Sequence, residues 1–346
     1  MMTEANPDTN VMGLTRSDYK GERSTLCPGC GHNTIATQII MACYEMGIHP
    51  ARIAKFSGIG CSSKSANYFL NKSFGFNGLH GRMPSMALGA AFADTKMKII
   101  GISGDGDTAS IGLGQFKHLV RRNLPMVYII ENNGVYGLTK GQFSATSQKG
   151  LELKYQGTNP FLPIDIVKEA LIGNASFIAR GFAGDPKQLK ELIKSALSHR
   201  GISVLDIISP CVSFNNREDT LHSYQWGRQH EAPLHDIAYV PTRRSIIIDD
   251  FAEGETREVT LHDGSVVILK KLDKDYDPTN KWHAITMIEE AEKNDWLLTG
   301  LIYVDPDQPT LYDFLNFTEE EPLNRMSVDK LRPNKSTLDQ INNRMR

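Results

Sequence analysis

The amino-acid sequence predicts an α/β protein with a mostly parallel sheet and helices on both faces of that sheet. Short apolar segments of strand type alternate along the chain with segments whose apolar residues recur at helical spacing, which is typical of parallel strands joined by crossover helices. Glycine, aspartate, asparagine or cysteine follows several of these strands within a few residues. Ligands bind beyond the carboxyl ends of parallel strands, so these residues can share one rim of the sheet.

The first two thirds of the chain contain five predicted strands and five predicted helices. The strands are expected at 52–58, 97–103, 125–131, 176–181 and 202–209. The helices are expected at 33–47, 84–94, 111–122, 164–172 and 186–199. The last helix has Pro186 at its start and Gly201 after its end, positions at which these residues are common.

The character of the chain changes near residue 220. A polar stretch precedes two segments that resemble short strands, "SIIIDD" (245–250) and "VTLHDGSVVILKK" (259–271), and these are followed by a helix near 280–294 and by "GLIYVDP". We therefore expect an N-terminal arm (1–20), a main domain (21–235), a C-terminal subdomain or partner-contacting arm with short strands and a helix (236–316), and a polar tail (317–346).

Composition excludes several classes of protein. The 346 residues are 40% apolar and 23% charged with a net charge of −2, which is ordinary globular composition and gives no reason to expect a nucleic-acid or membrane partner. No apolar run approaches the roughly 20 residues of a membrane helix. The start has no basic segment followed by an apolar core, so we expect no secretory signal and a cytoplasmic location.

Five cysteines are too few and too scattered for an extracellular disulfide framework. Cys43 lies in a segment with helical spacing and is most simply a small buried apolar residue. Cys27 and Cys30 form a CxxC around Pro28 and Gly29, which is compatible with a redox disulfide, half of a zinc site, or part of an iron-sulfur site.

The segment from residue 97 to 142 carries the most informative pattern. A strand ends at Gly104-Asp105-Gly106-Asp107, and a second strand ends 26 residues further on at Asn132-Asn133. Glycines beside Asp105 allow the backbone to approach a diphosphate, and the following helix start offers free N–H groups. Asp105, the Asn133 amide and the Val135 carbonyl are oxygen ligands of the kind that Mg²⁺ prefers.

This spacing resembles the thiamin diphosphate motif, in which GDG is followed after about two dozen or more residues by Asn. The resemblance implies that Asp105, Asn133 and Val135 hold Mg²⁺ within a thiamin diphosphate-binding fold. The alternative is a glycine-rich turn between a strand and a helix, followed by an unrelated Asn-Asn-Gly turn.

The segments "CPGCGH", "GIGCSS", "HGRMPSMALGAA", "GDGDT" and "GVYGLTKGQ" resemble, in this order, the β subunit of the 2-oxoacid:ferredoxin oxidoreductases, most closely the 2-oxoglutarate branch. The resemblance implies that Cys27, Cys30, Cys61 and Cys211 hold one 4Fe-4S cluster. It also implies CoA-dependent oxidative decarboxylation of a 2-oxoacid, with reversible transfer of electrons to ferredoxin. Alternatives are a zinc-stabilised binding module, a non-oxidative thiamin diphosphate enzyme, and a family member acting on pyruvate or a branched-chain 2-oxoacid.

Further residues are expected in the pocket because they lie beside these motifs. We assign His80 to the catalytic site, and Lys64 and Lys140 to the far carboxylate of the substrate, because an unpaired buried carboxylate is costly. His32 and Arg82 are additional candidates. The residues expected to contact the cofactor are Gly60, Ser62, Ser63, His80, Gly104, Asp105, Gly106, Asp107, Asn133, Val135, Gly137 and Leu138.

One expected part of a thiamin enzyme has no assignment in this sequence. The glutamate that activates the cofactor comes from the α subunit in the family that the chain resembles. We therefore expect an α subunit as partner, in an αβ heterodimer or its dimer, together with ferredoxin, CoA and a 2-oxoacid.

Overall fold

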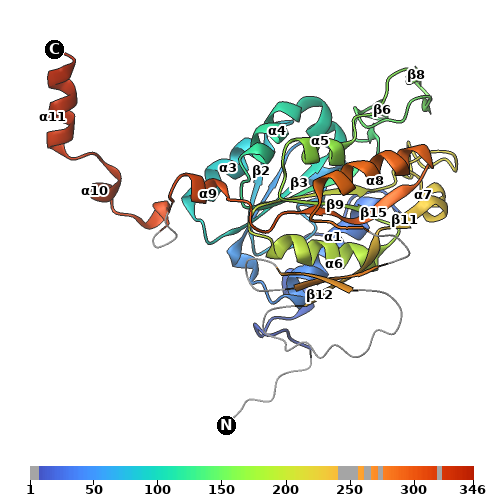
Figure 1. Cartoon of the computed structure of the whole chain (residues 1–346), viewed down its shortest axis with the longest axis horizontal. Helices are drawn as coiled ribbons and strands as arrows, with labels where there is room; N and C mark the ends of the chain where they lie inside the picture. The colour runs from blue at the N-terminus through green and yellow to red at the C-terminus, as the bar shows by residue number, and fades with distance from the viewer. Residues whose placement is uncertain (1–7, 241–255, 261–265, 272–275, 318–321) are drawn as a thin grey trace, which may run out of the picture.

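Eight strands form the central sheet of the protein (Figure 1). The computed structural model describes residues 8–240, 256–260, 266–271, 276–317 and 322–346. The strand order is β11-β15-β9-β10-β4-β3-β1-β2, and all neighbours are parallel except β15 and β9. The strands are β1 (Ile53–Ser57), β2 (Phe74–Asn77), β3 (Lys98–Gly104), β4 (Met126–Asn132), β9 (Phe177–Phe182), β10 (Ile202–Ile208), β11 (Glu231–Pro233) and β15 (Leu297–Val304).

Helices cover both faces of this sheet, as predicted (Figure 1). Strand β4 shows the reason, because Tyr128 and Ile130 face one apolar cluster whereas Val127 and Ile129 face the other. Helices α1 (Gly31–Glu45) and α6 (Pro186–Ser198) contribute to the second cluster. The first cluster takes residues from α3 (Met83–Ala93), α4 (Leu113–Arg121), α5 (Ile166–Ile172) and α8 (Lys281–Lys293).

The sequence predictions for the main sheet are confirmed, since the five strands and five helices expected before residue 210 end within two residues of their predicted bounds. Several short elements were not predicted. They are α2 (Cys61–Ser65), strand β2, the hairpins β5–β6 (Val135–Tyr136, Gln142–Phe143) and β7–β8 (Glu152–Leu153, Gly157–Thr158), and α7 (Tyr224–His230). Elements of two to seven residues show too little periodicity to be recognised in a sequence.

The region after residue 235 is divided between two sheets. Strands β12 (His235–Val240), β14 (Val266–Lys271) and β13 (Thr256–Thr260) form an antiparallel sheet of their own, whereas β15 lies inside the main sheet between β11 and β9. The predicted strand 245–250 lies outside the described residues. The division of the chain into domains stays a prediction, but α8 and β15 are integral to the main core.

The polar tail contains helices rather than extended chain alone. Short helix α9 (Leu311–Phe314) lies against the body, and α10 (Val328–Leu331) and α11 (Lys335–Arg344) extend away from it (Figure 1). The remaining short helical turns cover Arg16–Tyr19, Pro50–Arg52, Gly106–Ile111 and Leu323–Arg325. None of the described helices has the length and hydrophobicity needed to cross a bilayer.

Candidate functional site

Two adjoining cavities lie at the carboxyl ends of β1, β3, β4 and β10. The first measures ≈ 90 Å³ and is lined by the Gly104–Asp107 turn and by the residues that follow β4. The second measures ≈ 190 Å³ and is lined by four cysteines. The residues shared by the two walls are His32, Cys61, Asn133, Gly137 and Leu138.

The first cavity brings together most of the residues predicted to contact a cofactor. Gly60 has a φ of +123°, and this glycine-favouring conformation turns the chain from β1 into α2. Ser63 does not line the cavity; it is buried behind it, and its hydroxyl has no partner among the described residues. The predicted residues in the wall are Gly60, Ser62, His80, Gly104, Asp105, Gly106, Asp107, Asn133, Val135, Gly137 and Leu138.

Asp105 is a buried carboxylate at the floor of this cavity, with a side chain that is 1% exposed. Burial raises its pKa above the ordinary range, and hydroxyl donors partly offset this. Thr146 Oγ1 donates to Oδ2 at 2.7 Å, and Ser144 donates to the same oxygen. Oδ1 accepts only a long bond of 3.4 Å from the Asn133 N–H among the described hydrogen bonds. A buried carboxylate with one oxygen held by hydroxyl groups and the other bound only weakly fits the role of a metal ligand.

Asn133 and Val135 also fit the role of metal ligands, whereas His80 and Asp107 contact each other. The Asn133 side-chain oxygen lies 3.1 Å from the Val135 N–H, so these two predicted ligands form one compact turn. His80 contacts Asp107 through Nδ1, and the Gly81 N–H donates to the same carboxylate oxygen at 2.7 Å. The Asp107 side chain therefore orients His80 at the mouth of the cavity rather than facing a cation itself.

The second cavity brings together the four cysteines that the sequence singled out. Cys30 is the N-cap of α1, Cys61 begins α2, and Cys211 follows β10. A Cβ atom placed on Gly137 would lie 3.7 Å from the Sγ atoms of both Cys61 and Cys211. Cys43 does not line the cavity; it lies on α1, fully buried in the apolar core, and burial raises its pKa to about 12.

The four cysteines line one cavity, and three of them have raised pKa values. Among the described residues, no three His, Cys, Asp or Glu side chains converge closely enough to hold one ion. Burial raises the pKa values of Cys30, Cys61 and Cys211, for Cys30 to about 12. Burial therefore favours the protonated thiols in the chain without a bound metal.

His32 and Glu131 form a buried polar pair in the wall of the first cavity. Nδ1 of His32 lies 2.6 Å from the Ser209 hydroxyl and 3.6 Å from Glu131 Oε2, which accepts from Ser65 at 2.8 Å. Burial lowers the pKa of His32 to about 4 and raises that of Glu131 well above its ordinary value. At 3.6 Å the contact between His32 and Glu131 is longer than a hydrogen bond, and burial disfavours the charged form of both side chains.

The two predicted lysines lie in different cavities. Lys64, half-buried on α2, lines the cysteine cavity. Lys140 is exposed, has a φ of +76°, and lines a separate cavity of ≈ 470 Å³ together with Lys154 and Arg217. Arg82 is exposed at the start of α3 and lines neither cysteine nor cofactor cavity.

Sequence reasoning missed several residues that complete the site. Glu131 precedes the paired asparagines, and Ser144 and Thr146 lie in the "FSATS" segment after β6. His222, which lies 3.1 Å from the side-chain oxygen of Asn132, belongs to a polar stretch without a motif. A hydroxyl-rich segment close to a motif is the one available signal, and it does not identify which hydroxyl reaches Asp105.

Comparison with protein-family models gives one match. Residues 54–207 match the thiamine pyrophosphate enzyme C-terminal domain, described as TPP binding. This segment includes the first cavity's Gly104–Asp107 turn and Asn133.

Comparison with individual proteins gives a consistent set of relatives. The chain is 39% identical over 199 residues to a 2-oxoacid:ferredoxin oxidoreductase subunit beta from Saccharolobus solfataricus, a match covering 57% of this chain and 65% of that protein. Less than two thirds of the length of the first relatives is thus matched. It is 33% identical over 243 residues to a 2-oxoglutarate synthase subunit KorB from Methanocaldococcus jannaschii, covering 67% and 88% of the two chains.

A solved structure extends the similarity to the fold. A 2-oxoglutarate:ferredoxin oxidoreductase from Magnetococcus marinus, with 2-oxoglutarate, coenzyme A and succinyl-CoA bound, superposes with a TM-score of 0.72 at 30% identity. The alignment covers 91% of this chain and 92% of that one.

Proposed function

The chain belongs to the β subunits of the 2-oxoacid:ferredoxin oxidoreductases, and we propose that it oxidatively decarboxylates a 2-oxoacid, with 2-oxoglutarate as the preferred substrate. The products are the acyl-CoA, succinyl-CoA for 2-oxoglutarate, with CO₂ and reduced ferredoxin. The same site would allow the reverse, CO₂-fixing reaction.

The observation that carries the proposal is the shared wall of the two cavities. Cys61, Asn133 and Gly137 each border both the glycine-rich cavity and the cysteine cavity. A substrate oxidised in the first cavity would therefore be separated from an electron acceptor in the second by only the thickness of these residues. A non-oxidative thiamin enzyme would not need this second cavity.

The residues of the first cavity fit Mg²⁺ and thiamin diphosphate. The buried Asp105 carboxylate, the Asn133 amide and the Val135 carbonyl would hold the metal, and the glycines around Asp105 would let backbone N–H groups approach a diphosphate. Thiamin diphosphate, when bound, supplies carbanion stabilisation. The protein excludes water from this chemistry through the buried His32 and Glu131 wall and orients His80 through Asp107.

Cys27, Cys30, Cys61 and Cys211 would hold one 4Fe-4S cluster. Tetrahedral zinc places four thiolates about 2.3 Å from one ion, and no set of side chains arranged in that way is found among the described residues. A cluster of several iron atoms is held by four thiolates spread around a larger body, which suits a cavity of ≈ 190 Å³.

The preference for 2-oxoglutarate rests on Lys64 and on the relatives. Lys64 lines the cysteine cavity close to Cys61, which also borders the cofactor cavity. At this boundary its ammonium would pair with the second carboxylate of a dicarboxylic substrate that extends from the cofactor cavity. Several relatives carry 2-oxoglutarate in their names.

The first proposed partner follows from the activating glutamate, to which no residue of this sequence was assigned. We propose that an α subunit supplies the activating glutamate, that the pair forms an αβ heterodimer or its dimer, and that ferredoxin receives the electrons. The five cysteines are free thiols, which suits a reducing cytoplasmic location.

The test is anaerobic co-purification of the full chain with its α subunit, followed by assay of iron, sulfide and thiamin and of CoA-dependent ferredoxin reduction with 2-oxoglutarate. We expect four irons and one thiamin diphosphate per β subunit. Asp105→Ala should lose thiamin diphosphate and keep iron, because it removes the anionic metal ligand but no thiol. Asp339→Ala, on the exposed helix α11, is the matched control and should keep both. Zinc without iron, or thiamin content unchanged in Asp105→Ala, would contradict the assignment.

A further inference from the structure

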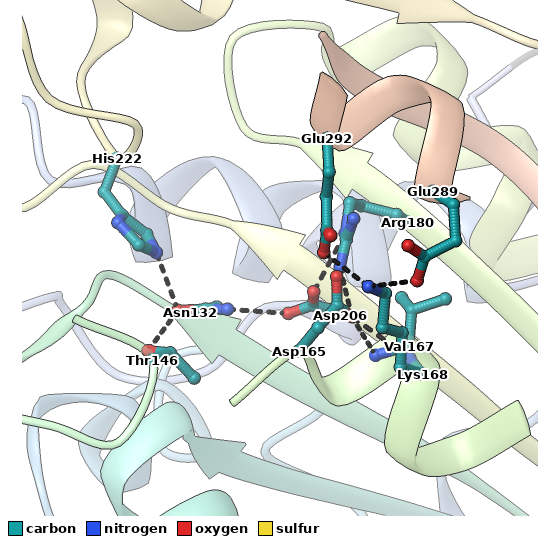
Figure 2. A network of polar contacts seen from close by, with 10 residues as sticks. All are labelled: Asn132, Thr146, Asp165, Val167, Lys168, Arg180, Asp206, His222, Glu289 and Glu292. Atoms are coloured by element: carbon teal, nitrogen blue, oxygen red, sulfur yellow. Dashed lines mark hydrogen bonds and ion pairs between the residues drawn. The ribbon is translucent and has the colours of Figure 1, made fainter. Parts of the chain in front are cut away.

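A buried chain of polar contacts runs from Arg180 through Asp206 and Asn132 to Thr146 (Figure 2). Thr146 in turn donates to Asp105. Arg180 on β9 donates from Nε to Asp206 on β10 at 3.0 Å. It also donates from a terminal nitrogen to Asp165, the N-cap of α5, at 2.7 Å. Asp206 is 1% exposed, so without this arginine a buried carboxylate would be left unpaired, which is costly.

Asp206 fixes the orientation of the Asn132 side chain. The Asn132 amide nitrogen donates to Asp206 Oδ1 at 3.0 Å. An ionised carboxylate only accepts hydrogen bonds, so it must face the NH₂ group. The amide oxygen of Asn132 is consequently turned toward Thr146 and His222, at 3.0 and 3.1 Å (Figure 2).

His222 and Thr146 are in turn constrained by that oxygen. Burial lowers the pKa of His222 to about 4, so the ring is neutral, and its Nε2 must carry the proton that the Asn132 oxygen accepts. Thr146 has one hydroxyl proton and three acceptors within reach, Asp105 Oδ2 at 2.7 Å, Asn132 Oδ1 at 3.0 Å and the Ser144 hydroxyl at 3.1 Å. The charged carboxylate forms the strongest of these bonds, and the Asn132 oxygen takes the weaker branch of a three-centre bond.

We propose that Arg180, Asp206, Asn132 and Thr146 act as positioning residues that hold Asp105 with Oδ2 turned into the Thr146 and Ser144 hydroxyls and Oδ1 presented to the magnesium ion. This inference rests on the proposed function, since it takes Asp105 as the metal ligand. It assigns a role to Ser144 and Thr146, which lie outside the sequence motif, and to an arginine whose guanidinium does not reach either cavity wall.

The network of polar contacts reaches the protein surface at Lys168. Lys168 on α5 forms ion pairs of 2.7 Å with both Glu289 and Glu292 of α8 (Figure 2). These side chains are partly exposed, and such surface pairs contribute little. The positioning chain therefore begins at Arg180, and Lys168 lies beyond it.

The experiment measures Mg²⁺ affinity directly, by titrating Mg²⁺, and Mn²⁺ as a paramagnetic probe, into the thiamin diphosphate-loaded complex of the full chain with its α subunit. Thr146→Val keeps the shape but removes the hydroxyl and should weaken metal binding by about tenfold. Thr146→Ser, which restores a hydroxyl, should recover affinity to within about threefold. Thr158→Val, an exposed threonine on β8, is the matched control and should bind as the unaltered chain.

Arg180→Lys tests the end of the chain of contacts that lies farthest from Asp105. Lysine keeps the positive charge but cannot reproduce the simultaneous contacts of the guanidinium with Asp165 and Asp206. We expect a severalfold loss of Mg²⁺ affinity, while Lys168→Met should change nothing. Unaltered metal affinity in Thr146→Val would overturn the positioning role and leave the proposed function standing, as would a lowered melting temperature without a change in affinity. If the unaltered complex itself shows no magnesium-dependent cofactor binding, both proposals fall.

Discussion

At the scale of single residues, the surroundings of a buried cysteine distinguish a packing residue from a candidate ligand. Cys43 and Cys30 are both buried and both have a pKa raised to about 12. They differ in their surroundings, since Cys43 lies among apolar side chains of the core and Cys30 borders a cavity with three other cysteines.

The first residue-scale prediction follows from that difference. Cys43→Ala should leave iron and sulfide content intact, because Cys43 is only an apolar packing residue. Cys211→Ala should lose the cluster, because a thiolate ligand is removed. Iron analysis of the two anaerobically purified variants decides the point; iron retained in Cys211→Ala, or lost in Cys43→Ala, would refute the ligand assignment.

A second prediction concerns the lysines. The sequence suggested that both Lys64 and Lys140 contact the far carboxylate of the substrate, and the structure separates them into different cavities. Lys64→Ile should lower kcat/KM for 2-oxoglutarate by about tenfold or more and leave pyruvate unchanged or improved, because a charged pocket becomes apolar.

Lys140→Ile is the companion variant, and we expect it to change both substrates alike. Steady-state kinetics with the two 2-oxoacids test both variants. Equal losses in Lys64→Ile would assign that lysine to the cofactor, and a loss confined to 2-oxoglutarate in Lys140→Ile would return Lys140 to the substrate site.

At the scale of elements, a buried histidine joins the small antiparallel sheet to the main sheet. His235 begins β12, and its Nε2 accepts the Leu301 N–H of β15 at 3.1 Å. The adjacent Gly300 has a φ of +114°, and a Cβ there would lie 3.2 Å from Nε2. This close approach and the positive φ both favour glycine at position 300.

A pH-dependent loss of stability follows. Burial lowers the pKa of His235 to about 4, against an ordinary value near 6.5. Between these values the unfolded chain binds the proton and the folded chain does not, so His235 contributes full stability above about pH 6.5 and loses it as pH falls toward 4. The expected loss between pH 7.5 and pH 5 is roughly 2 kcal/mol.

Urea unfolding of the unaltered chain and of His235→Gln, at both pH values, measures this contribution. Glutamine offers an acceptor that does not titrate, so the variant should lose less stability on acidification. Other buried histidines affect both proteins equally, and identical pH slopes would show that His235 does not contribute.

At the scale of the whole molecule, the site is an open rim at one edge of the sheet. The cofactor cavity measures only ≈ 90 Å³, far less than a drug-sized ligand site of about 300 to 1,000 Å³. Exposed apolar side chains of Ile59 and Leu138 stand in its wall. A second subunit is therefore expected to complete it.

We predict that the pure single chain is inactive toward any 2-oxoacid with an artificial electron acceptor, and that addition of the α subunit restores activity. Glu131 is a carboxyl of this chain in the cavity wall, but it is bonded to Ser65 and faces His32. Turnover by the single chain would show that the activating group lies within it, with Glu131 as the first residue to substitute.

The sequence by itself determined the elements whose hydrophobic periodicity extends over many residues and the motif whose residues lie close together in the chain. The strands and helices before residue 210 follow from hydrophobic periodicity, and the metal-site turn follows from glycines and carboxylates that are close in sequence. The assignment of four cysteines to one cluster came from the resemblance of their motifs to a known family, and it stays a prediction.

Only the tertiary structure decided which distant residues meet. Thr146 reaches Asp105 across 41 residues, and Arg180 pairs with Asp206 across 26; such contacts depend on strand order and register, which no local pattern records. The same reason explains why Lys64 and Lys140 separate and why β15, late in the chain, lies beside β9. Local interactions form the elements, and the burial of their two faces in one sheet determines how they are arranged.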